Sequence, residues 1–161
     1  MRLVSSIPLL TVALACLLAA CGPAKKSVFP PTVTIQQMHA VPGQPWQLVL
    51  RVSNNSYGEM DFKTIDATLR IADLPAVPLS QAIDLDIPAI AADVINVQLT
   101  PSTAMSAALG AAAAKGSEGS LPYAIEGAMT AKPEEEKAPR SFDFQARDWL
   151  SPVPGIADTF R

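Results

Sequence analysis

The sequence predicts a mostly β protein, an antiparallel β-sandwich of about seven strands with one short helix. Apolar and polar residues alternate with a period of two through most of the chain after Pro31, which is typical of strands that bury one face. Prolines, glycines and asparagines separate these alternating segments, and only the stretch 102–115 has the composition of a helix. We therefore expect a single folded domain over residues 32–150.

Three strands are expected before Pro75. The first begins at Val33 and continues to about Ala40, the second spans 45–53 and the third spans 62–72. The residues expected to face inward in the second and third strands are Trp46, Leu48, Leu50, Val52, Ile65, Ala67, Leu69 and Ile71.

A turn should follow the second strand at Asn54, Asn55 and Ser56. Their short side chains hydrogen bond readily to nearby backbone, and Asn tolerates positive φ. We interpret this triplet as structural.

Four further strands are expected after Pro75. A weak strand at 77–82 and an alternating segment at 83–88 precede a strand at 94–100, in which Ile95, Val97 and Leu99 should point inward. Strands at 121–131 and 141–147 should flank a polar hairpin tip at 132–139. Their expected inward residues are Leu121, Tyr123, Ile125, Gly127, Met129, Phe142, Phe144 and Ala146.

The helix and the C-terminus complete the predicted domain. The alanine-rich helix 102–115 should be capped by Ser102 or Thr103 and end at Gly116. Trp149 and Leu150 are expected to close the core, and residues 151–161 to form a loosely held C-terminal tail. These proportions are those of immunoglobulin-like or fibronectin type III-like sandwiches, although the Cys, Trp, Cys spacing of true immunoglobulin domains does not occur.

The first 21 residues have the order of a bacterial secretory signal. Arg2 precedes an apolar stretch, and small residues follow it. The segment Leu18, Ala19, Ala20 and Cys21 resembles the lipobox of bacterial lipoproteins. The resemblance implies that residues 1–20 are removed as a signal peptide, that a diacylglycerol is attached to the Cys21 thiol, and that the new amino terminus is acylated.

Two alternatives to this lipoprotein interpretation remain open. A transmembrane helix needs about 20 apolar residues, whereas this stretch is shorter and contains Pro8. An ordinary signal peptide with an incidental cysteine would also suit Ala19 and Ala20.

The lipoprotein interpretation also predicts a location. Two or three acyl chains hold a protein at a membrane surface durably. Bacterial lipoproteins that have no aspartate directly after the lipidated cysteine commonly move to the outer membrane, and this chain has Gly22 at that position. The resemblance therefore implies an anchor in the periplasmic face of the outer membrane. Residues 21–31 would then be the lipidated N-terminus and a short extended linker with Pro23, Pro30 and Pro31.

Composition excludes several functions. Cys16 lies in the predicted signal peptide and Cys21 would carry lipid, so the domain is expected to fold without a disulfide or a free thiol. The chain has 12 basic and 15 acidic side chains, a net charge of −3, and its basic residues are scattered. Nucleic-acid binding calls for a basic stripe, so no nucleic-acid partner is expected.

The order of the predicted elements resembles the group 2 late embryogenesis abundant proteins, whose unit is the water stress and hypersensitive response (WHy) domain. The resemblance covers residues 30–150 and rests on the segments 31–35, 50–55, 65–71, 79–90 and 121–127. At the end of the second strand the family has Asn-Pro-Asn, where this chain has Asn54, Asn55 and Ser56. The resemblance implies a folded, non-enzymatic protein with a role in desiccation or envelope stress.

No catalytic or metal site is predicted. His39 is the only histidine, which excludes a two-histidine metal site, and we expect it at the surface or at a strand end. Asp84 and Asp86 should share the polar face of one strand, and Glu134, Glu135 and Glu136 should form a solvated tip. Neither acidic set completes a calcium loop.

Two functional hypotheses follow from the sequence. The first is a membrane-anchored sandwich, without cofactors beyond its covalent lipid, that protects or organises the envelope under stress. The second is an interaction or hydrophobic-ligand module, in which the helix 102–115 partly covers an opening of the sandwich. The partner or ligand of such a module is not indicated by the sequence.

Overall fold

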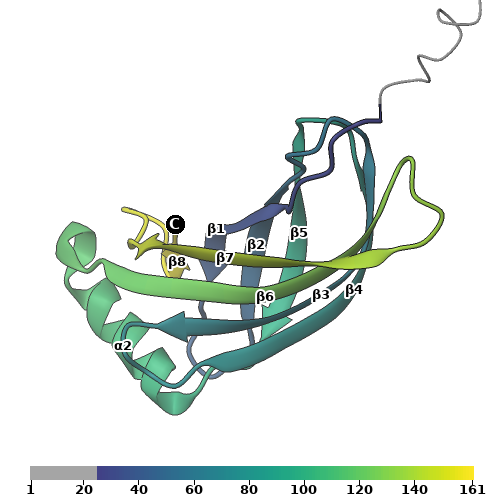
Figure 1. The fold of residues 1–161 in the computed structure, drawn as a ribbon. Coiled ribbons are helices and arrows are strands. Elements are labelled where there is room, and N and C mark those ends of the chain that lie inside the picture. Colours follow the sequence, from purple (N-terminus) through teal and green to yellow (C-terminus); the bar gives the residue numbers. More distant parts are fainter. Residues whose placement is uncertain (1–24) are drawn as a thin grey trace, which may run out of the picture.

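The computed structural model describes residues 25–161 (Figure 1). The predicted signal peptide 1–20, the lipobox Leu18 to Cys21, and Gly22 lie outside the described residues.

Two four-stranded antiparallel sheets form a β-sandwich, which confirms the predicted fold class. One sheet has the order β5-β2-β1-β8, formed by β1 (Thr32–His39), β2 (Trp46–Ser53), β5 (Ala92–Leu99) and β8 (Thr159–Phe160). The other has the order β4-β3-β6-β7, formed by β3 (Met60–Ile71), β4 (Val77–Ile87), β6 (Leu121–Pro133) and β7 (Arg140–Leu150). The pairs β2–β5 and β3–β6 join strands distant in sequence, as in Greek-key sandwiches. The two sheets cross at a steep angle (Figure 1).

The core consists of the side chains that the alternation places on the inner faces. Every predicted inward residue of the second and third strands is buried, as are Ile95, Val97 and Leu99. In β6 and β7 the inward set is also confirmed, with Leu121 and Ala146 half-buried at its margin.

A bulge in β3 changes which residues face the core. Met60 and Phe62 are buried, but beyond Lys63 the buried positions shift from even to odd numbers, beginning at Ile65. Opposite this bulge, the two predicted segments 77–82 and 83–88 form one continuous strand, β4.

Gly127 explains how β3 and β6 approach so closely. A Cβ atom at Gly127 would lie 2.2 Å from the backbone oxygen of Asp66 and 2.5 Å from Cα of Ala67, its cross-strand partner. No other residue fits there without movement of the backbone.

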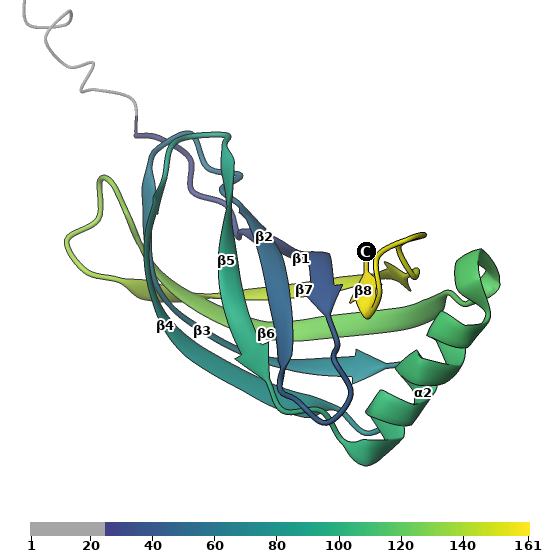
Figure 2. The ribbon, with the colours of Figure 1, turned by 180° about the vertical axis from the view of Figure 1, so that it is seen from behind.

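The single helix of the described residues, α2 (Thr103–Ala114), covers one end of the sandwich. Ser102 is its N-cap and accepts a hydrogen bond from the Met105 backbone N–H at 3.2 Å, as one of the predicted alternatives required. Gly116 adopts φ +61° after the helix and begins a 3₁₀ turn, η1 (Gly116–Glu118). The helix lies at the end opposite to the point where the described chain begins, as both views show (Figures 1 and 2).

Within residues 25–161, α2 is too short to cross a bilayer, and no longer apolar helix occurs.

The expectation of a loosely held C-terminal tail is wrong. Residues 151–153 turn back onto 159–161, with reciprocal hydrogen bonds between Ser151 and Arg161 of 2.9 and 3.0 Å. On its other side β8 pairs with Met38 and His39 of β1, so that it joins an edge of one sheet to the continuation of β7. Phe160 is buried in the core. β8 was not predicted from the sequence, because a strand of two residues is too short to show an alternation of apolar and polar residues.

The expectation that Trp149 closes the core is also wrong, whereas Leu150 is fully buried as predicted. Adjacent residues of a strand point to opposite faces, so only one of the two can face inward. Trp149 lies opposite Pro122 on the outer face of the sheet and is 60% exposed.

Substituting Phe160 tests whether the C-terminal segment belongs to the core. Phe160→Ala should lower the free energy of unfolding by about 3–5 kcal/mol, because it removes a buried aromatic side chain and leaves a cavity. Ile156→Ala in the adjacent loop, where the side chain is exposed, is the matched control and should change stability by less than about 0.5 kcal/mol. Equal effects in chemical denaturation would contradict the assignment.

Candidate functional site

The acidic and histidine candidates do not converge. His39 ends β1, is exposed, and its Nδ1 lies 3.2 Å from Thr159 Oγ1, which confirms the predicted strand-end position. Within residues 25–161, no group of three or more His, Cys, Asp or Glu side chains is arranged to hold a metal ion.

Lys63, at the β3 bulge, occupies the space between the acids on that sheet. Its Nζ lies 2.6 Å from Asp61 Oδ1 and 2.9 Å from Asp84 Oδ1. The contacts that the Lys63 ammonium makes with the Asp61 and Asp84 carboxylates raise the pKa of Lys63, and the hydrogen bond that it donates to Asp84 lowers the pKa of Asp84. Asp84 and Asp86 are exposed on one face of β4, as predicted, and Asp84 is an ion-pair partner of this lysine.

Asn54 is far more than a turn residue, because its amide joins the β2–β3 loop to the end of β4 at one end of the sandwich. The side chain is 1% exposed. Its Nδ2 donates to the carbonyl oxygens of Gly58 at 2.8 Å and of Ile87 and Pro88 at 3.0 Å each. Its Oδ1 accepts a hydrogen bond from the Ser56 backbone N–H at 2.9 Å.

The next two residues of the triplet fasten the N-terminal linker. Asn55 Nδ2 donates to the Pro30 carbonyl oxygen and to Thr32 Oγ1, both at 2.9 Å. Ser56 Oγ accepts from the Phe29 backbone N–H at 2.9 Å and lies 3.2 Å from the Phe29 carbonyl oxygen.

The described part of the linker, residues 25–31, is therefore docked on the domain, a contact that the prediction of a short extended linker over residues 21–31 did not include. Val28 packs against the core, and the Tyr57 backbone N–H donates to the Ser27 carbonyl oxygen at 3.0 Å. Only the proline-rich composition of this segment is visible in the sequence, and composition does not identify the side chains that receive the segment.

Lys26 extends the docking to the tip of the β6–β7 hairpin. Its Nζ lies 2.6 Å from Glu134 Oε2, and its backbone N–H donates to Glu135 at 3.2 Å. The Glu59 backbone N–H also donates to Glu134 Oε2, at 3.2 Å. The hydrogen bond from Lys26, and then the one from Glu59, lower the pKa of Glu134, while the same contact raises the pKa of Lys26. The predicted solvated tip thus holds the linker through Glu134.

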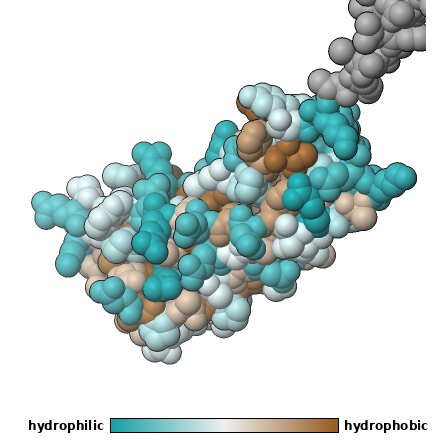
Figure 3. All heavy atoms as spheres, in the orientation of Figure 1, coloured by the Kyte–Doolittle hydropathy of each residue, from teal (hydrophilic) through white to brown (hydrophobic). Residues whose placement is uncertain are grey.

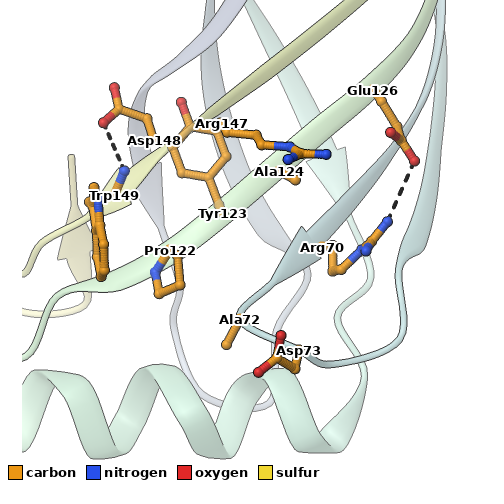
Figure 4. A pocket seen from close by; sticks show the side chains of 10 residues that line it. All are labelled: Arg70, Ala72, Asp73, Pro122, Tyr123, Ala124, Glu126, Arg147, Asp148 and Trp149. Atoms are coloured by element: carbon orange, nitrogen blue, oxygen red, sulfur yellow. Dashed lines mark hydrogen bonds and ion pairs between the residues drawn. The ribbon is translucent and has the colours of Figure 1, made fainter.

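A shallow groove that the sequence did not indicate lies on the outer face of the β3–β6–β7 sheet, toward the α2 end (Figure 4). Arg70 and Arg147 flank Ala124 in register, and Trp149 lies beside Pro122 in the adjoining row. The Arg70 guanidinium is 3.5 Å from Glu126 Oε1. The groove has an open volume of about 450 Å³. It is lined by an indole, two guanidinium groups and the carboxylates of Asp73, Glu126 and Asp148, without a nucleophile and base in contact.

A second hollow, of about 340 Å³, lies between α2 and the C-terminal loop. Its lining is largely apolar and includes Ala113, Val153, Ile156 and Phe160. This is the place where the predicted alanine-rich helix leaves an opening at the end of the sandwich.

Comparisons with known proteins identify no family. No family model matches the sequence, and no curated protein matches it. Among solved structures, a protein from Archaeoglobus fulgidus is similar with 8% identity over 79% of this chain and 98% of its own, at a TM-score of 0.46. The Northeast Structural Genomics Consortium target SoR45 has 12% identity over 79% and 89%, at 0.45. AT1g01470 from Arabidopsis thaliana has 8% identity over 86% and 88%, at 0.48.

Removing the Asn54 amide should destabilise the whole end of the sandwich. Asn54→Ala leaves three buried or half-buried carbonyl oxygens without their donor, so the free energy of unfolding should fall by about 2–3 kcal/mol. The exposed Asn55→Ala is the neighbouring control and should cost about 1 kcal/mol or less. Denaturation midpoints that are equal for the two variants would contradict the role assigned to Asn54.

The Lys26–Glu134 contact should be lost in acid. Because the folded pKa of Glu134 is depressed, its contribution is complete above the ordinary carboxyl pKa and is lost as the pH falls through the lower, folded value. An NMR titration of the Glu59 amide should therefore have its midpoint below about 4.3, the ordinary Glu value. Glu134→Gln should abolish the titration and Glu136→Gln should preserve it; a midpoint at or above the ordinary value would contradict the pairing.

Proposed function

We propose that the chain is a lipid-anchored envelope protein of bacteria, held by acyl chains on Cys21 in the periplasmic face of the outer membrane, whose sandwich acts without catalysis. The Leu18–Cys21 lipobox carries the proposal, and Gly22 supports the outer-membrane assignment. The sequence resemblance to the WHy domain supports a protective or organising role during desiccation or osmotic stress.

The docking of the linker limits how far the domain can lie from the proposed lipid on Cys21. Cys21 precedes Lys26, the first residue with a contact to the hairpin tip, by five positions. A fully extended chain spans at most about 3.3–3.6 Å per residue, so five residues reach at most about 18 Å. A lipid on Cys21 would thus hold the domain close to the membrane by the end at which Asn54 lies.

Substitution of the cysteine tests the anchor. Cys21→Ser should move the protein from the membrane fraction to the soluble periplasmic fraction, because no acyl chain can be attached through a thioether. Gly22→Asp should keep the protein membrane-bound and redirect it to the inner membrane. A Cys21→Ser protein that still fractionates with outer membranes would refute the anchor.

The protective role has a separate test. Deleting the gene should lower survival after drying or osmotic shock, and wild-type protein should restore it. Unchanged survival under both challenges would contradict the protective role without affecting the anchor.

The hollow between α2 and the C-terminal loop favours a second candidate function, the binding of a hydrophobic ligand. Native mass spectrometry of the protein extracted from membranes should then detect a non-covalent apolar ligand. Ile156→Asp, which places a charge at the hollow, should lose that ligand, and its absence from the wild-type protein would exclude this alternative.

A further inference from the structure

At the end of the sandwich where the linker docks, three neighbouring segments carry no charge, although Lys26, Glu59 and Glu134 lie beside them. The segments 27–31, 54–58 and 88–91 contain no Asp, Glu, Lys, Arg or His, in a chain of which 17% is charged. These segments contact one another through the Asn54 and Ser56 hydrogen bonds. Connecting loops of soluble domains are normally polar surfaces, so an uncharged cluster of this kind needs an explanation.

Three large apolar or aromatic side chains project from this end. Phe29, Tyr57 and Ile90 are 45%, 61% and 62% exposed. The rings of Phe29 and Tyr57 meet edge to face with centroids 6.1 Å apart, and the Ile90 backbone N–H donates to the Ser56 carbonyl oxygen at 3.1 Å. Hydrophobic side chains are visible here, close to where the described chain begins (Figure 3).

The backbone at Ile90 is strained, and hydrogen bonds from the Ile90 and Ala91 backbone N–H groups hold it in this conformation. Its φ of +54° is in the left-handed region, which is unfavourable for a β-branched residue. The Ile90 side chain lies mostly outside the core, so its burial cannot offset this cost. A contact with something outside the domain would explain why an isoleucine occupies this strained, exposed position.

We infer that Phe29, Tyr57 and Ile90 form a foot that rests in the interface of the bilayer beside the lipid anchor; this inference depends on the anchor proposed above. The chain to Cys21 leaves from this end, and the reach of at most about 18 Å keeps the three side chains near the acyl chains. Aromatic side chains with a polar tip, such as Tyr57, suit the boundary between headgroups and acyl chains.

The charge distribution favours a bilayer over a protein or a second copy of the chain. Neutral loops enter an interface without the cost of desolvating ions, and the nearest flanking carboxylate of the hairpin tip, Glu134, is paired with Lys26. Three side chains bury too little area to attach the protein alone. The foot would therefore set the orientation of the domain, with the groove at Trp149 and the α2 end directed away from the membrane.

Fluorescence quenching by lipids tests the foot, with the exposed Trp149 as a matched aromatic at the other end. The lipid-modified protein carrying Tyr57→Trp and Trp149→Phe is reconstituted into phosphatidylethanolamine and phosphatidylglycerol vesicles with brominated acyl chains. Emission from position 57 should fall by about half, whereas emission of Trp149 in the otherwise native protein should not change, because only an aromatic ring at the interface contacts the bromines. Trp46 is buried in both proteins and gives a constant background.

Ile90→Gly removes one side chain of the foot without disturbing the fold. Glycine accepts positive φ, so the substitution should not lower the thermal midpoint, yet it should weaken the quenching at position 57. Ala72→Gly, at φ +50° in the β3–β4 turn, is the backbone control and should leave the quenching unchanged.

The outcomes separate the foot from the anchor. Vesicle-bound protein whose position 57 is unquenched would overturn the foot and leave the anchor intact; a blue-shifted but unquenched emission would do the same and indicate a protein contact. Quenching that persists in the Cys21→Ser protein would support the foot and contradict the claim that attachment to the membrane requires the lipid anchor. Unmodified Cys21 by mass spectrometry, with no vesicle binding, would overturn both.

Discussion

The buried amide of Asn54 determines how one end of this sandwich is built. A side chain with two N–H donors faces three carbonyl oxygens, one from the loop after β2 and two from the end of β4 and the residue that follows it. Its oxygen receives the Ser56 N–H. Burial makes each of these bonds costly to lose, because water cannot replace the missing partner. With the loops fixed in this way, Ser56 and Asn55 are placed to receive the backbone of Phe29 and Pro30.

The consequence is a division of the molecule into two dissimilar ends. One end holds the linker and presents three uncharged segments beside the Lys26–Glu134 pair, and a lipid on Cys21 would face this end toward the membrane. The other end holds α2, the C-terminal hairpin and the charged groove with Trp149. Near this second end, β8 pairs with both β1 and the segment that continues β7. These backbone hydrogen bonds join the two sheets at their edge without a disulfide.

Prediction from sequence succeeded where a repeating pattern existed and failed where one residue decided the outcome. The alternation in β2 and β5 identified the core, and the alanine-rich segment identified α2. The bulge at Lys63 was missed because Phe62 and Ile65 each fit an alternating pattern in a different phase. The docked linker and β8 were missed because both depend on partners more than 20 residues away, which no local pattern encodes. Asn54 was recognised as structural, but its three acceptors could not be foreseen, since two of them lie beyond β4 or at its end.

Amide hydrogen exchange of the lipid-modified protein in vesicles tests the central claim, that the linker is part of the folded body, most directly. The Phe29 amide, bonded to Ser56 Oγ at 2.9 Å, and the Tyr57 amide, bonded to the Ser27 carbonyl at 3.0 Å, are the informative probes. The account predicts that both exchange far more slowly than an unstructured chain, and that Asn54→Ala accelerates both. Exchange of the Phe29 amide at the rate of an unstructured chain would contradict this claim, because the linker would then not be bound to the folded domain.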